Sequence, residues 1–180
     1  MTGPLRSAAV QQPDEVDQRV AADIDRHGWH VVLIPPEEDS PGWAHSIGLW
    51  QRFEHPELLV FGSEPRQLAA LVNALGERVR GGRRFAAGET DAGVLQGLPF
   101  AFAAVAPRWT HVFLGNAAWH YKSESFPVLQ GFWPDRGGRF PWQAECATEI
   151  AAEQPQLEHA EIHRALPERL LAALRREGAL

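Results

Sequence analysis

The sequence has one cysteine, Cys146, and one lysine, Lys122, in 180 residues. A single cysteine excludes an internal disulfide and any zinc site built from several cysteines, and it suits a reducing compartment. Nearly all positive charge is arginine, and the formal net charge is −6, so we expect no attraction to nucleic acid. No apolar run approaches the roughly 18 residues of a membrane span, and no basic segment leads into an apolar stretch near residue 1. We therefore expect a soluble, cytoplasmic protein that does not bind membranes.

Hydrophobic residues make up 44% of the chain, which is enough for one sizeable core. Residues 1–12 show no periodicity, and we expect a flexible tail there. The sequence predicts a single α+β domain over 13–143. It predicts a helical extension over 144–180, which could pack on that domain or on a second subunit.

The spacing of apolar residues, together with the Gly and Pro residues that interrupt it, predicts the helices and strands of this domain. Val16, Val20 and Ile24 recur every four residues before Gly28, which predicts a helix from Pro13. A second amphipathic helix is predicted over 65–80. Apolar runs predict six strands, of which the fourth and fifth would form a hairpin through "PRWT": 29–34, 44–50, 57–61, 98–106, 111–121 and 126–133. Further helices are predicted over 144–153, 156–164 and 167–177. Because strands and helices do not alternate strictly, we expect a mostly antiparallel, six-stranded, split-barrel-like sheet with a central amphipathic helix and flanking N- and C-terminal helices.

The positions of these histidines favour structural roles over metal binding or catalysis. His159 and His163 have a spacing that can chelate a metal on a helix, but without a third ligand nearby a solvated helix face is favoured. His55 precedes Pro56, and we expect its ring to bond a loop carbonyl and fix the turn. Strand alternation puts His45 on the face of Ile47 and Leu49, which predicts a core histidine.

Small residues and tryptophans are better candidates than the histidines for binding a ligand. Gly48 would let a backbone or a flat ligand approach its strand, and Ser46 could bond to that ligand; a barrel corner explains the glycine equally well. Seven tryptophans exceed what packing usually recruits, and several flank predicted strand ends. They can form a stacking pocket, plug a barrel or face a partner chain.

Five segments, "SIGLW", "HPELLVFG", "VLQGLPF", "FLGNAAWHY" and "FPVLQGFWPDRGGRFPW", follow one another in an order that resembles the uncharacterised bacterial family called domain of unknown function 4262, over about residues 20–143. That resemblance implies no established activity and no catalytic residues. Members commonly carry an aromatic such as Tyr where this chain has His45, which weakens the case for His45 as a ligand.

The order of elements more distantly resembles the flavin-reductase-like split barrels. That resemblance implies FMN or a related flat anionic cofactor. It places Ser46 at the flavin, Ser63 and Arg66 at its phosphate through the start of a helix, and His111 near the pocket. In that case Trp43, Trp50 or Trp119 would wall the ring. The run of Ser and Thr donors that split barrels often use is thin here.

Three functions follow as hypotheses. The first is a small-molecule or cofactor-binding protein of split-barrel type, a homodimer in our expectation, and an FMN-dependent oxidoreductase if the cofactor is present. The second is a non-catalytic interaction domain that uses the acidic loop Glu37–Asp39 and the C-terminal helices. The third, ranked last, is a metal-dependent enzyme using some of His45, His55, His111 and His120. An open cleft lined by Trp and Arg would favour the first, and a closed, filled barrel the second.

Overall fold

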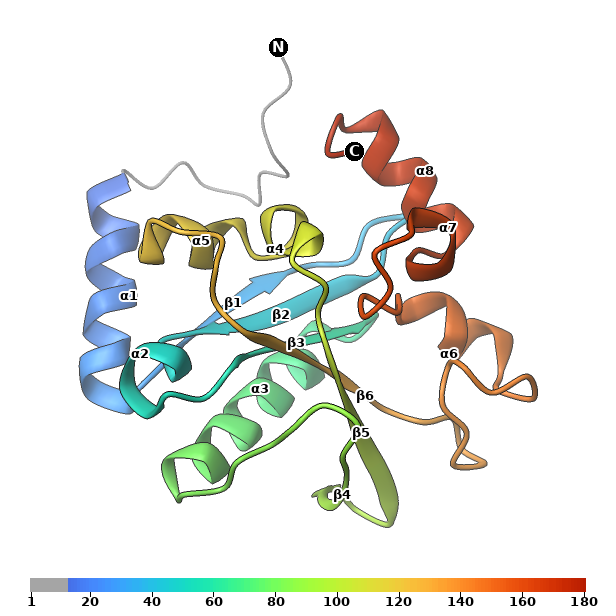
Figure 1. Cartoon of the computed structure of the whole chain (residues 1–180), viewed down its shortest axis with the longest axis horizontal. Helices are drawn as coiled ribbons and strands as arrows, with labels where there is room; N and C mark the ends of the chain where they lie inside the picture. The colour runs from blue at the N-terminus through green and yellow to red at the C-terminus, as the bar shows by residue number, and fades with distance from the viewer. Residues whose placement is uncertain (1–12) are drawn as a thin grey trace.

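A computed structural model describes residues 13–180, and the predicted tail over 1–12 lies outside the described residues. Helices lie on both sides of one sheet (Figure 1). The helices are α1 (Pro13–His27), α2 (Leu49–Phe53), α3 (Pro65–Arg80), α4 (Arg108–Phe113), α5 (Gly115–Tyr121), α6 (Thr148–Glu153), α7 (Ile162–Ala165) and α8 (Glu168–Arg176). The strands are β1 (His30–Ile34), β2 (Gly42–Ile47), β3 (Glu57–Gly62), β4 (Thr90–Leu95), β5 (Leu98–Ala104) and β6 (Val128–Phe132).

The sheet has the strand order β1-β2-β3-β6-β5-β4, with β1 and β4 at its edges. At its centre β3 and β6 run parallel, so that Glu57 lies opposite Val128 and Val60 opposite Gly131. The α+β prediction with six strands is confirmed, but the sheet is mixed and open. The split-barrel-like, mostly antiparallel arrangement is not confirmed. The reason is the connection from β3 to β6, which passes through α3, the β4-β5 hairpin, α4 and α5 before β6 returns alongside β3 in the same direction.

Two predicted strands are wrong in whole or in part. The segment 111–121 is helical, because Trp109, Phe113 and Ala117 recur every four residues and all three side chains are buried. The hairpin is made instead by β4 and β5 through the two-residue turn Gln96-Gly97, where Gly97 has φ 75°. The predicted strand 44–50 ends at Ile47, and Gly48, with φ 117°, is the N-cap residue before α2.

The sheet separates two apolar cores. On one face α3 packs against Leu58 and Val60 through a stripe of buried side chains, Leu68, Val72, Leu75 and Val79. On the other face α1, α4, α5, α7 and α8 contribute to a core that includes Leu59 and Phe61. Successive residues of β3 point to opposite faces, so a strand buried on both sides is apolar at nearly every position.

The C-terminal segment packs on this same domain. The Gln130 side chain on β6 donates to the Pro155 carbonyl and accepts from the Leu157 amide, while Leu170 and Leu174 of α8 enter the core with α4. The sequence left open whether this segment packs on a second subunit, and the structure gives it a place on its own chain.

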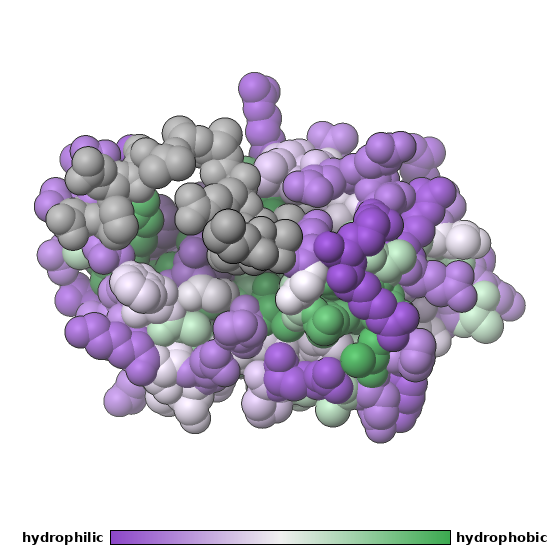
Figure 2. Space-filling view, turned by 90° about the horizontal axis from the view of Figure 1, so that it is seen from above, coloured by the Kyte–Doolittle hydropathy of each residue, from purple (hydrophilic) through white to green (hydrophobic). Residues whose placement is uncertain are grey.

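Figure 2 shows the face formed by α4, α5 and α8, with mostly hydrophilic residues and small separate groups of hydrophobic ones. Among residues 13–180, no helix has the length and apolar content to cross a membrane.

Candidate functional site

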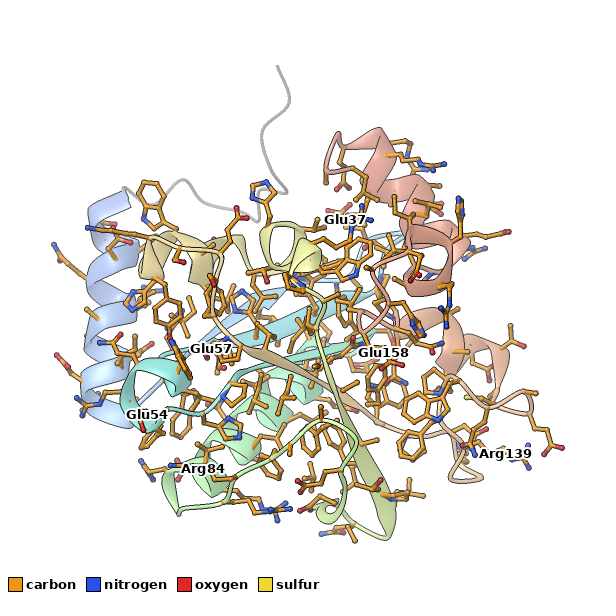
Figure 3. The ribbon with its side chains drawn as sticks, viewed as in Figure 1. Glu37, Glu54, Glu57, Arg84, Arg139 and Glu158 are labelled. Carbon is orange, nitrogen blue, oxygen red and sulfur yellow. The ribbon has the colours of Figure 1, made fainter. Side chains whose placement is uncertain are left out.

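A buried carboxylate, Glu57, stands at the start of β3 and collects four donors. One oxygen accepts from the amides of Gly48 (2.9 Å) and Trp50 (3.1 Å) and from the Tyr121 hydroxyl; the other accepts from the Ser46 hydroxyl. Figure 3 shows Glu57 in the interior, between α2 and the sheet. We call Glu57, Ser46, Tyr121 and these two amides the Glu57 cluster.

The Glu57 cluster is an architectural device. Three donors share one oxygen of the carboxylate and the Ser46 hydroxyl binds the other, so both oxygens are engaged by groups of the protein. The Gly48 and Trp50 amides belong to the first turn of α2, where backbone N–H groups have no helical partner, so Glu57 caps that helix from β3. Burial, and then the charge of Glu57, raise the pKa of Tyr121 well above its ordinary value, so its hydroxyl stays a donor.

The polar groups of Ser46 and Gly48 therefore already form hydrogen bonds within the protein. The Ser46 hydroxyl donates to Glu57 and accepts from the Leu58 amide at 2.9 Å, so it has no proton left for a flavin phosphate. An anionic phosphate would also meet the Glu57 carboxylate there. The Trp50 side chain points outward and is 40% exposed.

The remaining residues predicted for a flavin site do not join them. Ser63 and Arg66 lie beyond the opposite end of β3, and both are exposed. His111 is exposed on α4 and bonds Glu124 at 2.9 Å, and Trp119 is 70% exposed on α5. The predicted flavin ligands are thus distributed over separate parts of the molecule and do not fit FMN as one site.

His45 and His55 occupy the architectural positions expected for them. The His55 ring accepts from the Phe85 amide at Nε2 (3.1 Å), so Nδ1 carries the proton donated to the Pro56 carbonyl (2.7 Å). Burial lowers the pKa of His55. His45 is buried in β2, where burial lowers its pKa to about 4. Both rings are neutral at neutral pH.

Over residues 13–180, no group of three or more His, Cys, Asp or Glu side chains is placed to hold a metal ion. His159 and His163, predicted on one helix, do not share one: α7 starts at Ile162, and His159 precedes it.

A groove lies at the carboxyl ends of the parallel strands β3 and β6. Its inner part has a volume of about 170 Å³ and lies between the start of α3, the β4-β5 hairpin and the residues after β6. An outer part of about 670 Å³ continues along the loop after β6 to α6, and the two share Gln67, Leu98, Trp133 and Pro134. Ligands of open α/β sheets bind beyond the carboxyl ends of parallel strands, where neighbouring connections diverge. This groove is the candidate site.

The inner part is apolar with a polar rim. Leu68, Leu71, Leu95, Leu98 and Trp133 form its walls, together with Pro134. Ser63, Glu64, Gln67 and Glu153 supply its polar groups. Mostly apolar walls with a few polar groups are typical of small-molecule sites.

Trp133 is held rigidly in the wall of the groove. Its indole N–H donates to the Phe61 carbonyl at 2.8 Å. Its backbone N–H donates to the side-chain oxygen of Gln154 (3.0 Å), whose amide donates back to the Trp133 carbonyl (2.8 Å). A wall fixed in this way needs little ordering when a ligand binds.

Asp135 shapes the outer part. Its carboxylate accepts from the amides of Arg139, Gly137 and Ala147, which closes the loop after β6. These bonds, the one from Arg139 foremost, lower the pKa of Asp135. Its oxygens are therefore engaged in the loop and are not offered to a ligand.

Of the predicted site residues, Ser63 alone lines this groove. The sequence reasoning missed Leu71, Leu95, Leu98 and Trp133. Gly-Ser before a helix and Trp-Pro after a strand were visible signals, but their convergence depends on the parallel pairing of β3 with β6.

No curated protein and no solved structure matches the chain. One family model does, the domain of unknown function DUF4262, over residues 23–147. The match spans more than half of the chain and includes β1 to β6 and the loop after β6. The chain belongs to the DUF4262 family.

Proposed function

We propose that this protein binds a small molecule in the groove between the start of α3 and Trp133. The observation that carries the proposal is the coincidence of a preformed apolar pocket with the carboxyl ends of the central parallel strands. The groove is open and is lined by Trp133 and, in its outer part, by Arg136. An open groove lined by Trp and Arg is what the binding hypothesis expects, whereas the interaction-domain hypothesis expects a closed, filled barrel.

The size of the inner part limits what enters it. An apolar cavity of about 150 Å³ holds one benzene molecule. The inner part, at about 170 Å³, therefore accommodates one ring-sized apolar group, and the rest of the ligand would extend into the outer part. A three-ring flavin would exceed the inner part, and the residues predicted to hold FMN do not line it, Ser63 excepted.

The test uses benzyl alcohol as a neutral, ring-sized probe in ligand-observed NMR. Leu71 is half-buried on the wall of the groove, and Leu71→Trp fills the inner part with its indole. Leu33, on the edge strand β1 and 37% exposed, provides the matched control Leu33→Trp. We expect the wild type and Leu33→Trp to bind the probe and Leu71→Trp to lose it. Equal binding by all three proteins would contradict the proposal.

A further inference from the structure

We propose that the groove selects ligands that join a ring-sized apolar group to a protonated amine. This inference rests on the proposed function and names its ligand class. It comes from the charges at the rim of the inner part, where Glu64 and Glu153 stand beside the apolar walls. No arginine or lysine is among the residues that line the inner part within the described chain.

Both carboxylates are available to a ligand. Among residues 13–180, neither Glu64 nor Glu153 forms an ion pair, and neither side chain accepts a hydrogen bond; Glu64 precedes α3 without capping it. Three acidic groups elsewhere in the described chain differ in this respect: Glu89 and Asp91 are paired with Arg83, and Asp135 is engaged by amides. An amine in the groove would give these two carboxylates a partner close to an apolar surface.

The start of α3 opposes this preference, but by less. A helix N-terminus carries roughly half a positive charge, which favours anions, as the Ser63 and Arg66 hypothesis requires. Here Pro65 has no N–H, and the Gln67 and Leu68 amides already donate to the Glu64 carbonyl. Two carboxylates therefore outweigh the helix end by about one and a half charges.

The arginines near the site do not reverse that balance. Arg66 is exposed and is not among the lining residues. Arg136 lines only the outer part, where Glu149 also stands and offsets it. The inner part, where the ring would sit, thus keeps the negative rim.

The experiment compares three probes that differ only in the group attached to the ring: benzylamine, benzyl alcohol and benzoate, at pH 7 and low salt. Glu64 is exposed and Glu153 half-buried, and such pairs contribute about 0.2–1 kcal/mol each, so we expect benzylamine to bind about two- to thirtyfold more tightly than benzyl alcohol. Benzoate should bind more weakly than the alcohol. Added salt should shrink both differences.

The variant Glu64→Gln/Glu153→Gln should lose the preference for the amine, so that benzylamine and benzyl alcohol bind it with about equal affinity. The control is Glu54→Gln, which removes one charge at the end of α2, across the molecule from α6 (Figures 1 and 3); it should keep the preference. Equal affinities for the amine and the alcohol, or tightest binding of benzoate, would overturn the inference and leave the proposed function standing. Failure of all three probes would overturn both.

Discussion

Replacing the partners of Glu57 one at a time tests whether this cluster is architectural. In Tyr121→Phe the carboxylate loses one hydroxyl, but both of its oxygens keep a donor, and the Gly48 amide, which also reaches the Tyr121 oxygen at 2.9 Å, still bonds Glu57. One hydrogen bond to a charged group is worth about 1.5–3 kcal/mol, and that is the loss of unfolding free energy we expect.

Ser46→Ala should cost more. Within residues 13–180 the hydroxyl is the only donor to one oxygen of Glu57, and it is the acceptor for the buried Leu58 amide. Its removal takes away one charged hydrogen bond and leaves one buried N–H without a partner, which adds about 1–3 kcal/mol to the same 1.5–3 kcal/mol. We expect a total of about 2.5–6 kcal/mol, a large share of the roughly 5–15 kcal/mol of a typical domain.

Urea unfolding followed by circular dichroism measures both variants. The control hydroxyl deletion is Ser40→Ala, which removes a half-buried hydroxyl between β1 and β2 that donates to the Pro41 carbonyl at 3.2 Å. We expect the free energy of unfolding to fall in the order wild type, Tyr121→Phe, Ser46→Ala. A Ser46→Ala protein as stable as the wild type would refute it, because a buried carboxylate and a buried amide cannot both lose a partner without cost.

Three further predictions follow from buried contacts. Because the pKa of His45 is lowered in the folded protein, the unfolded chain binds the proton first as the pH falls below about 6.5. This group should therefore reduce the free energy of unfolding by on the order of 3 kcal/mol between pH 6.5 and pH 4. Unfolding measured at several pH values should show this decrease, and His45→Leu should diminish it. His55→Gln should retain more stability in thermal melts than His55→Ala, because an amide can both donate and accept between the Pro56 carbonyl and the Phe85 amide; equal melting temperatures would contradict that role. Gly76→Ala lies inside a helix, where alanine is usually stabilising, yet its Cβ would sit 2.5 Å from the Trp29 ring. We expect a net destabilisation of about 1–3 kcal/mol in urea unfolding, and a stabilised variant would show that the ring yields.

Local sequence patterns predict an element well when its buried side chains repeat at a single regular spacing. The stripe on α3 repeats at helical spacing and points into one core, so its bounds were confirmed to the residue, Pro65–Arg80. The strand predicted over 111–121 is wrong because aromatic and β-branched residues suit strands as well as short buried helices. The four-residue spacing of Trp109, Phe113 and Ala117 indicates a helix.

The candidate site depended on long-range pairing. Ser63 could be located from the start of a helix, but Trp133, Leu95 and Leu98 reach it only because β6 returns parallel to β3 and the β4-β5 hairpin turns back beside it. Glu57 also went unnoticed as a cap. A carboxylate at the front of an otherwise apolar strand was the available signal, since such a group needs partners when buried.

Crystals of the protein soaked with benzylamine test the central claim most directly. We expect electron density for the ring between Leu71 and Trp133, with the amine directed at Glu64 or Glu153. Density for the probe found only elsewhere on the protein, with the inner part of the groove filled by solvent, would contradict it.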